Sequence, residues 1–436
     1  MKEAREVDTL VSIAEDRDSL LRERPLLGVP LTVKECIALA GMPHTAGLVK
    51  RIGVVASEDA EAVKRLRAAG AIPMGVTNTS ECCMWMESYN NVYGTTNNPY
   101  NLECSVGGSS GGEAAILAAG GSVIGIGTDS GGSIRMPAFC CGVFGHKPSA
   151  GTSPQEGSWP LVQGPAAICA CTGPLCRYSK DLPLMLDVIV GNSPSDSANF
   201  SHKVQNVDVA LLKVVSIPSN GSNNVSSEVA SVHAQVEAHL KHHLHATVER
   251  SGVEQLRKSF SIWSDIIDED TGPRTREYLM NEEGRLNPFL ELGKWLFGFS
   301  QYTLPCLELA LMDFCSGQPK MGDDNAEAHM KRDNLKRELE ALMGDNGVIL
   351  YPTMPRPAMK HCRAILHPFD SAYTIIFNAL GFPATAVPIG TSEKGLPLGV
   401  QIISKEGNDH LTIAVAMALE TTMPGVGWNS PQGLPF

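Results

Sequence analysis

The segment GTDSGGSIRMP (residues 127–137) places two adjacent glycines directly before a serine. Gly131 and Gly132 let the backbone adopt conformations that other residues avoid, so consecutive N–H groups can point into one small space. Such a group of donors can stabilise an oxyanion, and Ser133 at its end is placed like a nucleophile. The same pattern is also typical of a glycine-rich turn whose serine only caps the turn, and the segment alone leaves both interpretations open.

A serine hydroxyl needs a base to take its proton, and that base is usually a histidine. His44, His146 and His410 have no sequence context typical of a catalytic triad. The G-x-S-x-G pattern of residues 107–112 follows a polar loop where an α/β-hydrolase would have an apolar strand, so it is weak evidence for that fold. The histidines of residues 233–245 could bind a metal ion from one helix face, but a solvated polar helix is the simpler interpretation.

A lysine is the other candidate base, because burial disfavours the charged form of its side chain. Lys34 lies inside the apolar segment LLGVPLTVKECIALAG (residues 26–41), where a lysine is unusual. Its side chain could instead reach solvent from the end of a strand, or pair with Glu35. The segment alone does not decide between these alternatives.

Helical and apolar segments alternate around these residues. Residues 57–78 indicate a helix capped by Ser57 and then a short strand. Small residues over about 113–119 indicate a second helix, which the predicted strand 122–127 follows. Further apolar strands precede a last helix that begins near Asp409. The alternation predicts an α/β fold whose sheet is covered by helices on both faces.

Two long segments depart from this alternation. Residues 192–228 are rich in Ser and Asn, which indicates a surface insertion around one apolar strand. Residues 285–315 form the most apolar long segment, but Pro288, Pro305 and charged side chains argue against a transmembrane helix. This segment forms either a pair of core helices or an apolar lid that faces a membrane.

The composition excludes several classes of protein. The 436 residues are 43% hydrophobic and carry a formal net charge of −12, which is typical of a folded globular protein and not of a nucleic-acid binder. The twelve cysteines are scattered without the C-x2-C spacing of a zinc site, so we interpret them as free thiols in a reducing compartment and expect no metal. The amino-terminal residues lack the apolar stretch of a signal peptide or a membrane span.

Three segments occur in order along the chain: GVPLTVKE, VGGSSGGEAAILAAGG and GTDSGGSIRMPAFCCGVFGHKPS. Together they resemble the motifs of the amidase signature family, whose members use a Ser-cisSer-Lys triad. The resemblance covers nearly the whole chain except residues 192–228. It implies a single amidase signature domain over residues 1–436, built on a large mixed β-sheet. Within the family, the chain is most similar to the fatty-acid amide hydrolases.

The resemblance assigns roles to the residues considered above. It implies that Ser133 attacks the amide carbonyl and that Ser109, held by a cis peptide in the family, relays the proton to Lys34. The oxyanion hole would be formed by the backbone N–H groups of Ser130, Gly131, Gly132 and Ser133.

Further residues are implied around the triad. Asp129 and Arg135 resemble residues that orient the loop, although an ordinary buried ion pair is an equally good interpretation. Ser110 would form a hydrogen bond to the triad. The residues that would line the substrate pocket are Cys83, Met84, Trp295 and Phe299.

The resemblance also implies a substrate and a location. The substrate would be a lipid-like amide, either a primary fatty-acid amide or an N-acylethanolamine, and no cofactor is expected. Residues 285–315 would form the acyl channel and a lid, and the full-length protein would be an intracellular homodimer associated with a membrane or lipid. Because relatives carry further helices before the lysine motif, this chain is expected to lack N-terminal helices.

Two alternatives stay open beside a fatty-acid amide hydrolase: an amidase for small amides, and an inactive homologue that binds lipid. An amidotransferase subunit is disfavoured, because the chain has no tRNA-related partner region and is more similar to the fatty-acid amide hydrolases. A nucleotide-binding protein is disfavoured, because GIGTDSGG lacks the Gly-Lys-Ser/Thr ending of a phosphate-binding loop.

Overall fold

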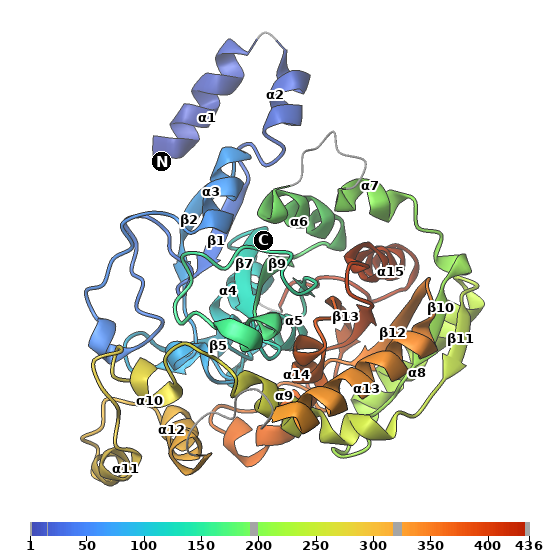
Figure 1. Cartoon of the computed structure of the whole chain (residues 1–436). Coiled ribbons are helices and arrows are strands. Elements are labelled where there is room, and N and C mark those ends of the chain that lie inside the picture. The colour runs from blue at the N-terminus through green and yellow to red at the C-terminus, as the bar shows by residue number, and fades with distance from the viewer. Residues whose placement is uncertain (1, 15, 192–198, 317–324, 432–436) are drawn as a thin grey trace.

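The structure is a computed structural model that describes residues 2–14, 16–191, 199–316 and 325–431. Ten strands form one sheet in the order β11-β10-β12-β14-β13-β8-β9-β7-β1-β2 (Figure 1). The strands at each end of the sheet are parallel to their neighbours, and the strands in the middle are antiparallel. The predicted mixed sheet is confirmed.

The strands of this sheet are β1 (Pro30–Lys34), β2 (Ile72–Thr77), β7 (Ile124–Asp129), β8 (Phe144–Lys147), β9 (Cys171–Cys176), β10 (Lys213–Ser216), β11 (Thr247–Arg250), β12 (Gly347–Pro352), β13 (Ala384–Thr391) and β14 (Pro397–Ser404). Two short pairs outside it are formed by β3 (Tyr89–Asn90) with β4 (Gly94–Thr95) and by β5 (Asn97–Asn98) with β6 (Asn101–Ser105).

The α-helices are α1 (Lys2–Ile13), α2 (Arg17–Glu23), α3 (Glu61–Ala68), α4 (Gly111–Ala118), α5 (Arg135–Cys141), α6 (Leu182–Val190), α7 (Phe200–Gln205), α8 (Ser227–His242), α9 (Ser259–Ile267), α10 (Thr275–Tyr278), α11 (Pro288–Leu296), α12 (Leu304–Ser316), α13 (Ala326–Met343), α14 (Ala372–Ala379) and α15 (Asp409–Thr422).

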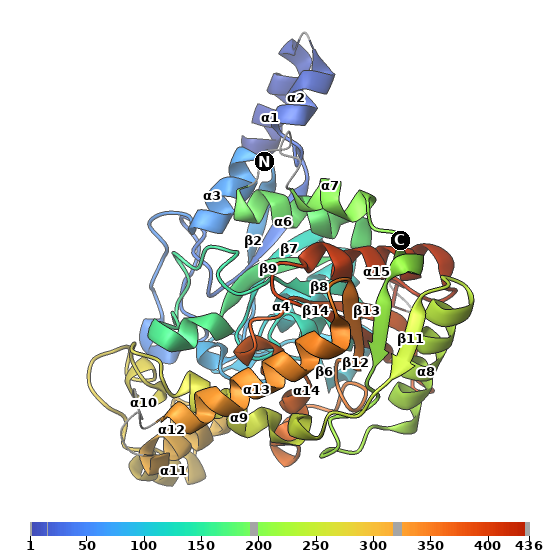
Figure 2. The same ribbon diagram turned by 45° about the vertical axis from the view of Figure 1, so that its right-hand side comes forward.

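Helices cover both faces of the sheet, as predicted (Figure 2). Along β12 the side chains alternate between two cores, because successive residues of a strand point to opposite faces. Val348 and Leu350 belong to the core that includes residues of α8, whereas Ile349 and Tyr351 belong to the core that includes residues of α13 and α14. All four side chains are buried, which explains why the strand is apolar on both faces.

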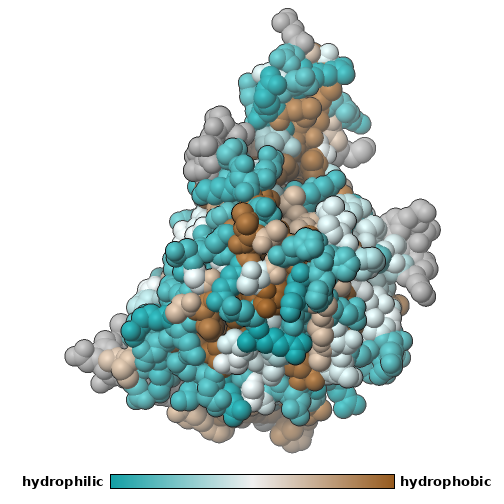
Figure 3. Space-filling model, turned by 90° about the vertical axis from the view of Figure 1, so that its right-hand side faces the viewer, coloured by the Kyte–Doolittle hydropathy of each residue, from teal (hydrophilic) through white to brown (hydrophobic). Residues whose placement is uncertain are grey.

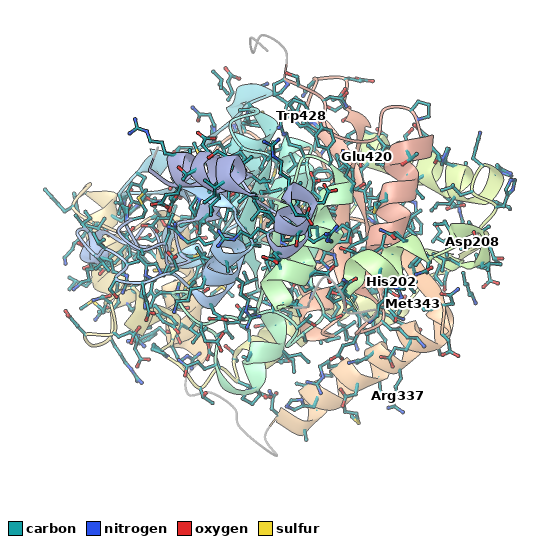
Figure 4. The ribbon with its side chains drawn as sticks, turned by 90° about the horizontal axis from the view of Figure 1, so that it is seen from above. His202, Asp208, Arg337, Met343, Glu420 and Trp428 are labelled. Atoms are coloured by element: carbon teal, nitrogen blue, oxygen red, sulfur yellow. The ribbon has the colours of Figure 1, made fainter. Side chains whose placement is uncertain are left out.

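Helix α13 shows how these outer helices are amphipathic. Met343 is buried in the core that α13 shares with α14, whereas Arg337 on the same helix is exposed (Figure 4). On the face shown in Figure 3, hydrophobic residues occur in separate groups between hydrophilic ones.

At the amino terminus, α1 and α2 form a helical hairpin that stands away from the rest of the molecule (Figures 1 and 2). An ion pair between Glu3 and Arg67 connects it to α3. Among the described helices, none is both long enough and apolar enough to cross a membrane.

Several local predictions need correction. Helix α3 begins at Glu61 after Ala60, which has no capping side chain, so Ser57 is not its cap. Within residues 192–228, residues 192–198 lie outside the described residues. The expected apolar strand is β10, but it lies in the main sheet between β11 and β12 and not in a surface insertion.

The histidine-rich helix α8 is also less exposed to solvent than predicted. His233 and His239 of α8 are buried, where they contact the Leu350 carbonyl and the Thr422 hydroxyl. The solvated helix predicted from the composition of this segment is therefore wrong for these two side chains.

Candidate active site

The candidate active site lies where β1 and β7 end. These two strands are parallel neighbours, with Val33 opposite Ile126, so their carboxyl ends meet at the same edge of the sheet. Strand β1 ends at Lys34, and β7 ends at Asp129 and continues into the loop of residues 130–133. The sheet thereby brings the lysine and the glycine-rich loop together.

Lys34 is fully buried and bonded to two hydroxyl groups. Its Nζ atom donates to Ser109 Oγ at 2.7 Å and to Thr128 Oγ1 at 2.8 Å. The Glu35 carboxylate instead accepts hydrogen bonds from Thr45. The two structural alternatives for Lys34, a side chain in solvent and a pair with Glu35, are therefore not found.

Ser109 lies between β6 and the first turn of α4, and the Gly108–Ser109 peptide bond is cis. Thr79 Oγ1 donates to the Ser109 carbonyl at 2.9 Å. Helix α4 can approach this region closely because Gly112 has no side chain: a Cβ atom there would lie 2.5 Å from the backbone N of Asn78. Close packing of backbones therefore holds Ser109 beside Lys34.

Ser133 is more accessible than the other two candidates. Its exposure is intermediate, whereas Lys34 and Ser109 are both fully buried. The Ser110 N–H donates to the Ser133 carbonyl at 3.1 Å, and Ser110 Oγ contacts the Thr128 carbonyl at 3.3 Å. The structure thus brings together the three residues of the expected triad, with the expected nucleophile on the open side.

Asp129 organises the loop through a buried carboxylate. It accepts hydrogen bonds from the N–H groups of Gly132 at 2.7 Å and Ile134 at 3.1 Å. It also forms a buried ion pair with Arg135, whose Nε lies 3.0 Å from Oδ2. Burial opposes ionisation of Asp129, but the charge and hydrogen bonds of Arg135, together with Asn378, outweigh it and hold the pKa well below its usual range. Asp129 and Arg135 therefore form an ion pair and orient the loop at the same time.

Two side chains from distant helices hold the carbonyl groups of the same loop. Trp263 Nε1 of α9 donates to the Ser130 carbonyl at 2.9 Å, and Thr374 Oγ1 of α14 donates to the Gly131 carbonyl at 2.8 Å. In a trans peptide the C=O and N–H groups point in opposite directions. The hydrogen bond from Trp263 therefore points the Gly131 N–H away from the indole ring. The hydrogen bond from Thr374 points the Gly132 N–H toward Asp129.

This arrangement modifies the expected oxyanion hole. The Gly132 N–H is bonded to Asp129, so it is not available to a substrate in this structure. In the hydrogen bonds of the described residues, the N–H groups of Gly131 and Ser133 have no protein acceptor. Gly132 has a φ of +115°, and a Cβ atom there would collide with Thr374, so this position requires glycine.

The four residues expected to line the substrate pocket do not lie together. Cys83 lies at the site, where its Sγ atom is 3.4 Å from Thr79 Oγ1. Met84 packs against the small core that includes Cys82 and Leu307. Trp295 and Phe299 are 39% and 80% exposed at the end of α11 and beyond it, so the structure does not gather them around the triad candidates.

Sequence analysis missed the residues that support the site. They are Thr79, Thr128, Trp263, Thr374, Asn378 and Gln401. Most of them lie on other elements, far from the motifs in sequence. A polar residue inside an apolar segment, such as Asn378 in TIIFNALGF, was the available signal.

The histidine alternative does not form a second site. His146 contacts Asp409 at 3.2 Å and Thr385 at 2.9 Å. The hydroxyl of the nearby Ser149 donates to Asp409. All four side chains are buried, so a substrate has no access to them. Over the described residues, no group of three or more His, Cys, Asp or Glu side chains could hold a metal ion.

Comparison with known proteins identifies the family. The family model described as Amidase matches residues 6–413. Fatty-acid amide hydrolase 2-A of Danio rerio is 45% identical over 442 residues, which cover 99% of this chain and 81% of the relative. Fatty-acid amide hydrolase 2 of Homo sapiens is 43% identical over 445 residues, with the same coverage.

Solved structures share the fold. A 6-aminohexanoate cyclic dimer hydrolase superimposes with a TM-score of 0.77 at 27% identity, covering 100% of this chain and 90% of that protein. A fatty acid amide hydrolase superimposes with a TM-score of 0.76 at 24% identity, covering 96% and 76%. Family match, sequence identity and fold agree: the chain belongs to the amidase family, and it is an amide hydrolase.

Proposed function

We propose that the chain hydrolyses fatty-acid amides, with Ser133 as the nucleophile and Ser109 and Lys34 as its proton relay. The observation that carries this proposal is the 2.7 Å contact between Lys34 Nζ and Ser109 Oγ, both fully buried beside the more accessible Ser133. Among the described residues Lys34 forms no ion pair, and a lysine in its uncharged form can accept a proton.

In the acylation step, Ser133 Oγ attacks the carbonyl carbon of the amide. The Ser133 proton passes to Ser109 Oγ as the Ser109 proton passes to Lys34 Nζ. The negative charge that forms on the carbonyl oxygen is stabilised by backbone N–H groups. Gly131 and Ser133 are the donors best placed for this role, with Ser130 as a third, because Asp129 holds the Gly132 N–H.

When the tetrahedral intermediate collapses, the C–N bond breaks and the leaving amine needs a proton. The relay runs in reverse: Lys34 returns a proton to Ser109, which passes it to the amine nitrogen. A water molecule then attacks the carbonyl carbon of the acyl-Ser133 ester and loses a proton to the same relay. The bond between the acyl carbon and Ser133 Oγ breaks, the relay returns the proton to Ser133 Oγ, and the fatty acid is released. Protonation of the amine is the reason that this relay suits amides.

A fatty-acid chain is the proposed acyl group for two reasons. Relatives at 45% and 43% identity are named fatty-acid amide hydrolases. The chain also carries an exposed apolar surface on α11, α12 and the segment between them. This surface, here called the cap patch, consists of Phe289, Leu290, Trp295, Leu296, Phe297, Phe299, Met312 and Phe314.

The cap patch also supports association with a lipid surface. Leu296, Phe297 and Phe299 are each at least 75% exposed. A group of exposed apolar side chains marks a surface that contacts a membrane, a ligand or another protein. Aromatic and leucine side chains are typical of helices that lie in a membrane interface. The cap patch would deliver a membrane-dissolved amide to the enzyme. The homodimer remains a prediction, which light scattering of the purified chain tests.

The first experiment measures hydrolysis of oleamide and of benzamide by the chain and by Ser133→Ala and Lys34→Ala. We expect the chain to hydrolyse oleamide and both variants to lose about 10³-fold or more in kcat. Hydrolysis of benzamide alone would favour an amidase for small amides. No hydrolysis of either, with no labelling of Ser133 by a fluorophosphonate, would favour an inactive lipid-binding homologue.

A second experiment tests the lipid surface separately. Phe297→Ser should reduce co-sedimentation of the chain with phosphatidylcholine vesicles. Leu211→Ser is the matched control, because Leu211 is 75% exposed, close to the 78% of Phe297, but does not belong to the cap patch. An equal loss for both variants, or no loss for Phe297→Ser, would contradict the proposed role of the cap patch.

A further inference from the structure

Two cysteines lie beside the triad candidates, and their thiols have no role in the proposed hydrolysis. Cys36 follows Lys34 by two residues and is 2% exposed. Its Sγ atom is 3.7 Å from Thr128 Oγ1, the same hydroxyl that accepts a hydrogen bond from Lys34 at 2.8 Å. One hydroxyl group therefore separates the Cys36 thiol from the candidate base.

Cys83 reaches the triad candidates by a second route. Its Sγ atom is 3.4 Å from Thr79 Oγ1, which donates to the Ser109 carbonyl at 2.9 Å. Cys82 and Cys83 both have positive φ values, 51° and 59°, so the chain turns sharply at this point. The turn places Cys82 in the core beside α12 and leaves Cys83 half-buried at the site.

The two thiols are also electrostatic neighbours: burial and the side-chain hydrogen bond with Cys83 raise the pKa of Cys36, and the same hydrogen bond lowers the pKa of Cys83. Together with Thr128, Lys34, Ser109 and Thr79, they complete a closed ring of contacts. Any covalent change at the thiol pair therefore displaces a direct neighbour of the triad candidates.

We propose that Cys83 and Cys36 form a thiol modification site, at which a small-molecule disulfide converts the pair into a disulfide and switches off the proposed triad. Cys83 reacts first because it is the more exposed residue of the two, and Cys36 is the resolving thiol. The hydrogen bond with Cys36, aided by the charge of Lys34 and by Thr79, lowers the pKa of Cys83 to about 6 against the effect of burial, which favours the reactive thiolate.

The reaction balances as two thiol–disulfide exchanges. The Cys83 thiolate attacks one sulfur of RS–SR, a new S–S bond forms, and RS⁻ leaves and takes up the proton that Cys83 lost. Cys36 then attacks the Cys83 sulfur and releases the second RS⁻, which takes the Cys36 proton. One RS–SR is reduced to two RSH, and two protein thiols are oxidised to one disulfide.

Loss of activity follows from the ring of contacts. An S–S bond is about 2.05 Å long, so its formation draws Cys36 toward Cys83 and away from Thr128. Thr128 then loses one of its contacts and changes its position relative to Lys34. This effect on activity rests on the proposed function, whereas formation of the disulfide does not.

The test uses the full chain with its two exposed cysteines replaced, Cys315→Ser and Cys362→Ser, so that only buried and half-buried thiols remain. The protein is treated with 2-hydroxyethyl disulfide, free thiols are alkylated, and the peptides are mapped by mass spectrometry. We expect a Cys36–Cys83 cross-link, a fall of at least 10-fold in oleamide hydrolysis and in fluorophosphonate labelling, and recovery of both with dithiothreitol. A circular dichroism spectrum of the treated protein checks that it stays folded.

Two variants in the same background identify the order of the steps. Cys36→Ser should stop at a mixed disulfide on Cys83. Cys83→Ser should leave Cys36 unmodified, with equal hydrolysis rates before and after treatment. Absence of the cross-link in the folded protein, or a cross-linked protein with unchanged hydrolysis and labelling, would overturn the proposal. A cross-link in a chain that hydrolyses no amide before treatment would overturn the proposed function and leave the modification site in place.

Discussion

The glycine-rich loop, residues 129–135, and the α11–α12 pair are held in the molecule in opposite ways. Arg135 is fully buried, and its guanidinium bonds to Asp129, Asn378 and Gln401. In α11 only Pro288 is buried, and α12 is held by a small apolar core that includes Leu307 and Ala310. Reacting atoms must be positioned to within a fraction of an ångström, which takes many directional bonds. Contact with lipid needs only exposed apolar area, which carries no such requirement.

One buried group connects the two regions. The Glu81 carboxylate accepts hydrogen bonds from Thr303 N and Thr303 Oγ1, both at 2.8 Å, directly before α12 begins. Cys83 follows Glu81 by two residues in the same 3-10 turn. The helix pair with the exposed apolar surface is therefore attached to the turn that forms one wall of the site.

The largest effect on stability is expected at the buried ion pair. Arg135→Met leaves the Asp129 carboxylate buried without its countercharge, so the free energy of unfolding should fall by about 3–5 kcal/mol. Urea denaturation measures this change. The matched control is Arg250→Met, because the Arg250–Glu237 pair is 2.8 Å long but Arg250 is 66% exposed. We expect the control to lose less than about 1 kcal/mol, and equal losses would contradict the contrast between the two regions.

A pH dependence is expected from Glu113, beneath the site. Burial raises its pKa from 4.5 to about 7, against hydrogen bonds from Thr77 and Thr32. Between these two pH values the folded state holds a proton that the unfolded state has lost, so the contribution of Glu113 to stability falls as the pH rises.

Glu113→Gln removes this dependence. Relative to the wild type, its free energy of unfolding should rise by about 2–3 kcal/mol between pH 4.5 and pH 8. Urea denaturation at a series of pH values measures the difference. A difference that does not change with pH would show that Glu113 titrates alike in the folded and unfolded states.

A smaller effect is expected where a side chain holds the loop carbonyls. Trp263→Phe removes the indole N–H that bonds to the Ser130 carbonyl, and one hydrogen bond contributes about 0.5–1.5 kcal/mol. We expect kcat for oleamide to fall by about 3- to 10-fold with KM nearly unchanged. Trp159→Phe is the control, since the Trp159 indole bonds to Glu282 and not to the loop. A similar fall in kcat for both would count against the role of Trp263.

The smallest effect on stability is expected in the cap patch. Phe297 is 78% exposed, so Phe297→Ser should change the free energy of unfolding by less than about 0.5 kcal/mol. Urea denaturation of the variant measures this. A loss of 2 kcal/mol or more, on the scale of a core substitution, would show that Phe297 packs inside the protein and does not face its surroundings.

The sequence predicted the elements that carry local signals. Helix α4 and strand β7 were predicted within two residues of their observed limits, because small-residue and apolar periodicity is a property of the segment itself. The cap of α3 was wrong because a nearby serine is no evidence that its side chain reaches the helix. Strand β10 was predicted as part of a surface insertion, because its place in the sheet depends on β11 and β12.

The sequence by itself determined which residues can react: a serine after two glycines, a second serine before α4 and a lysine in an apolar strand. Only the tertiary structure decided what surrounds them. Thr128, Trp263 and Cys83 come from separate segments of the chain, and they meet because the sheet and its helices bring distant segments together. Residue type and local spacing are written along the chain, whereas contacts between distant segments arise from packing the whole core.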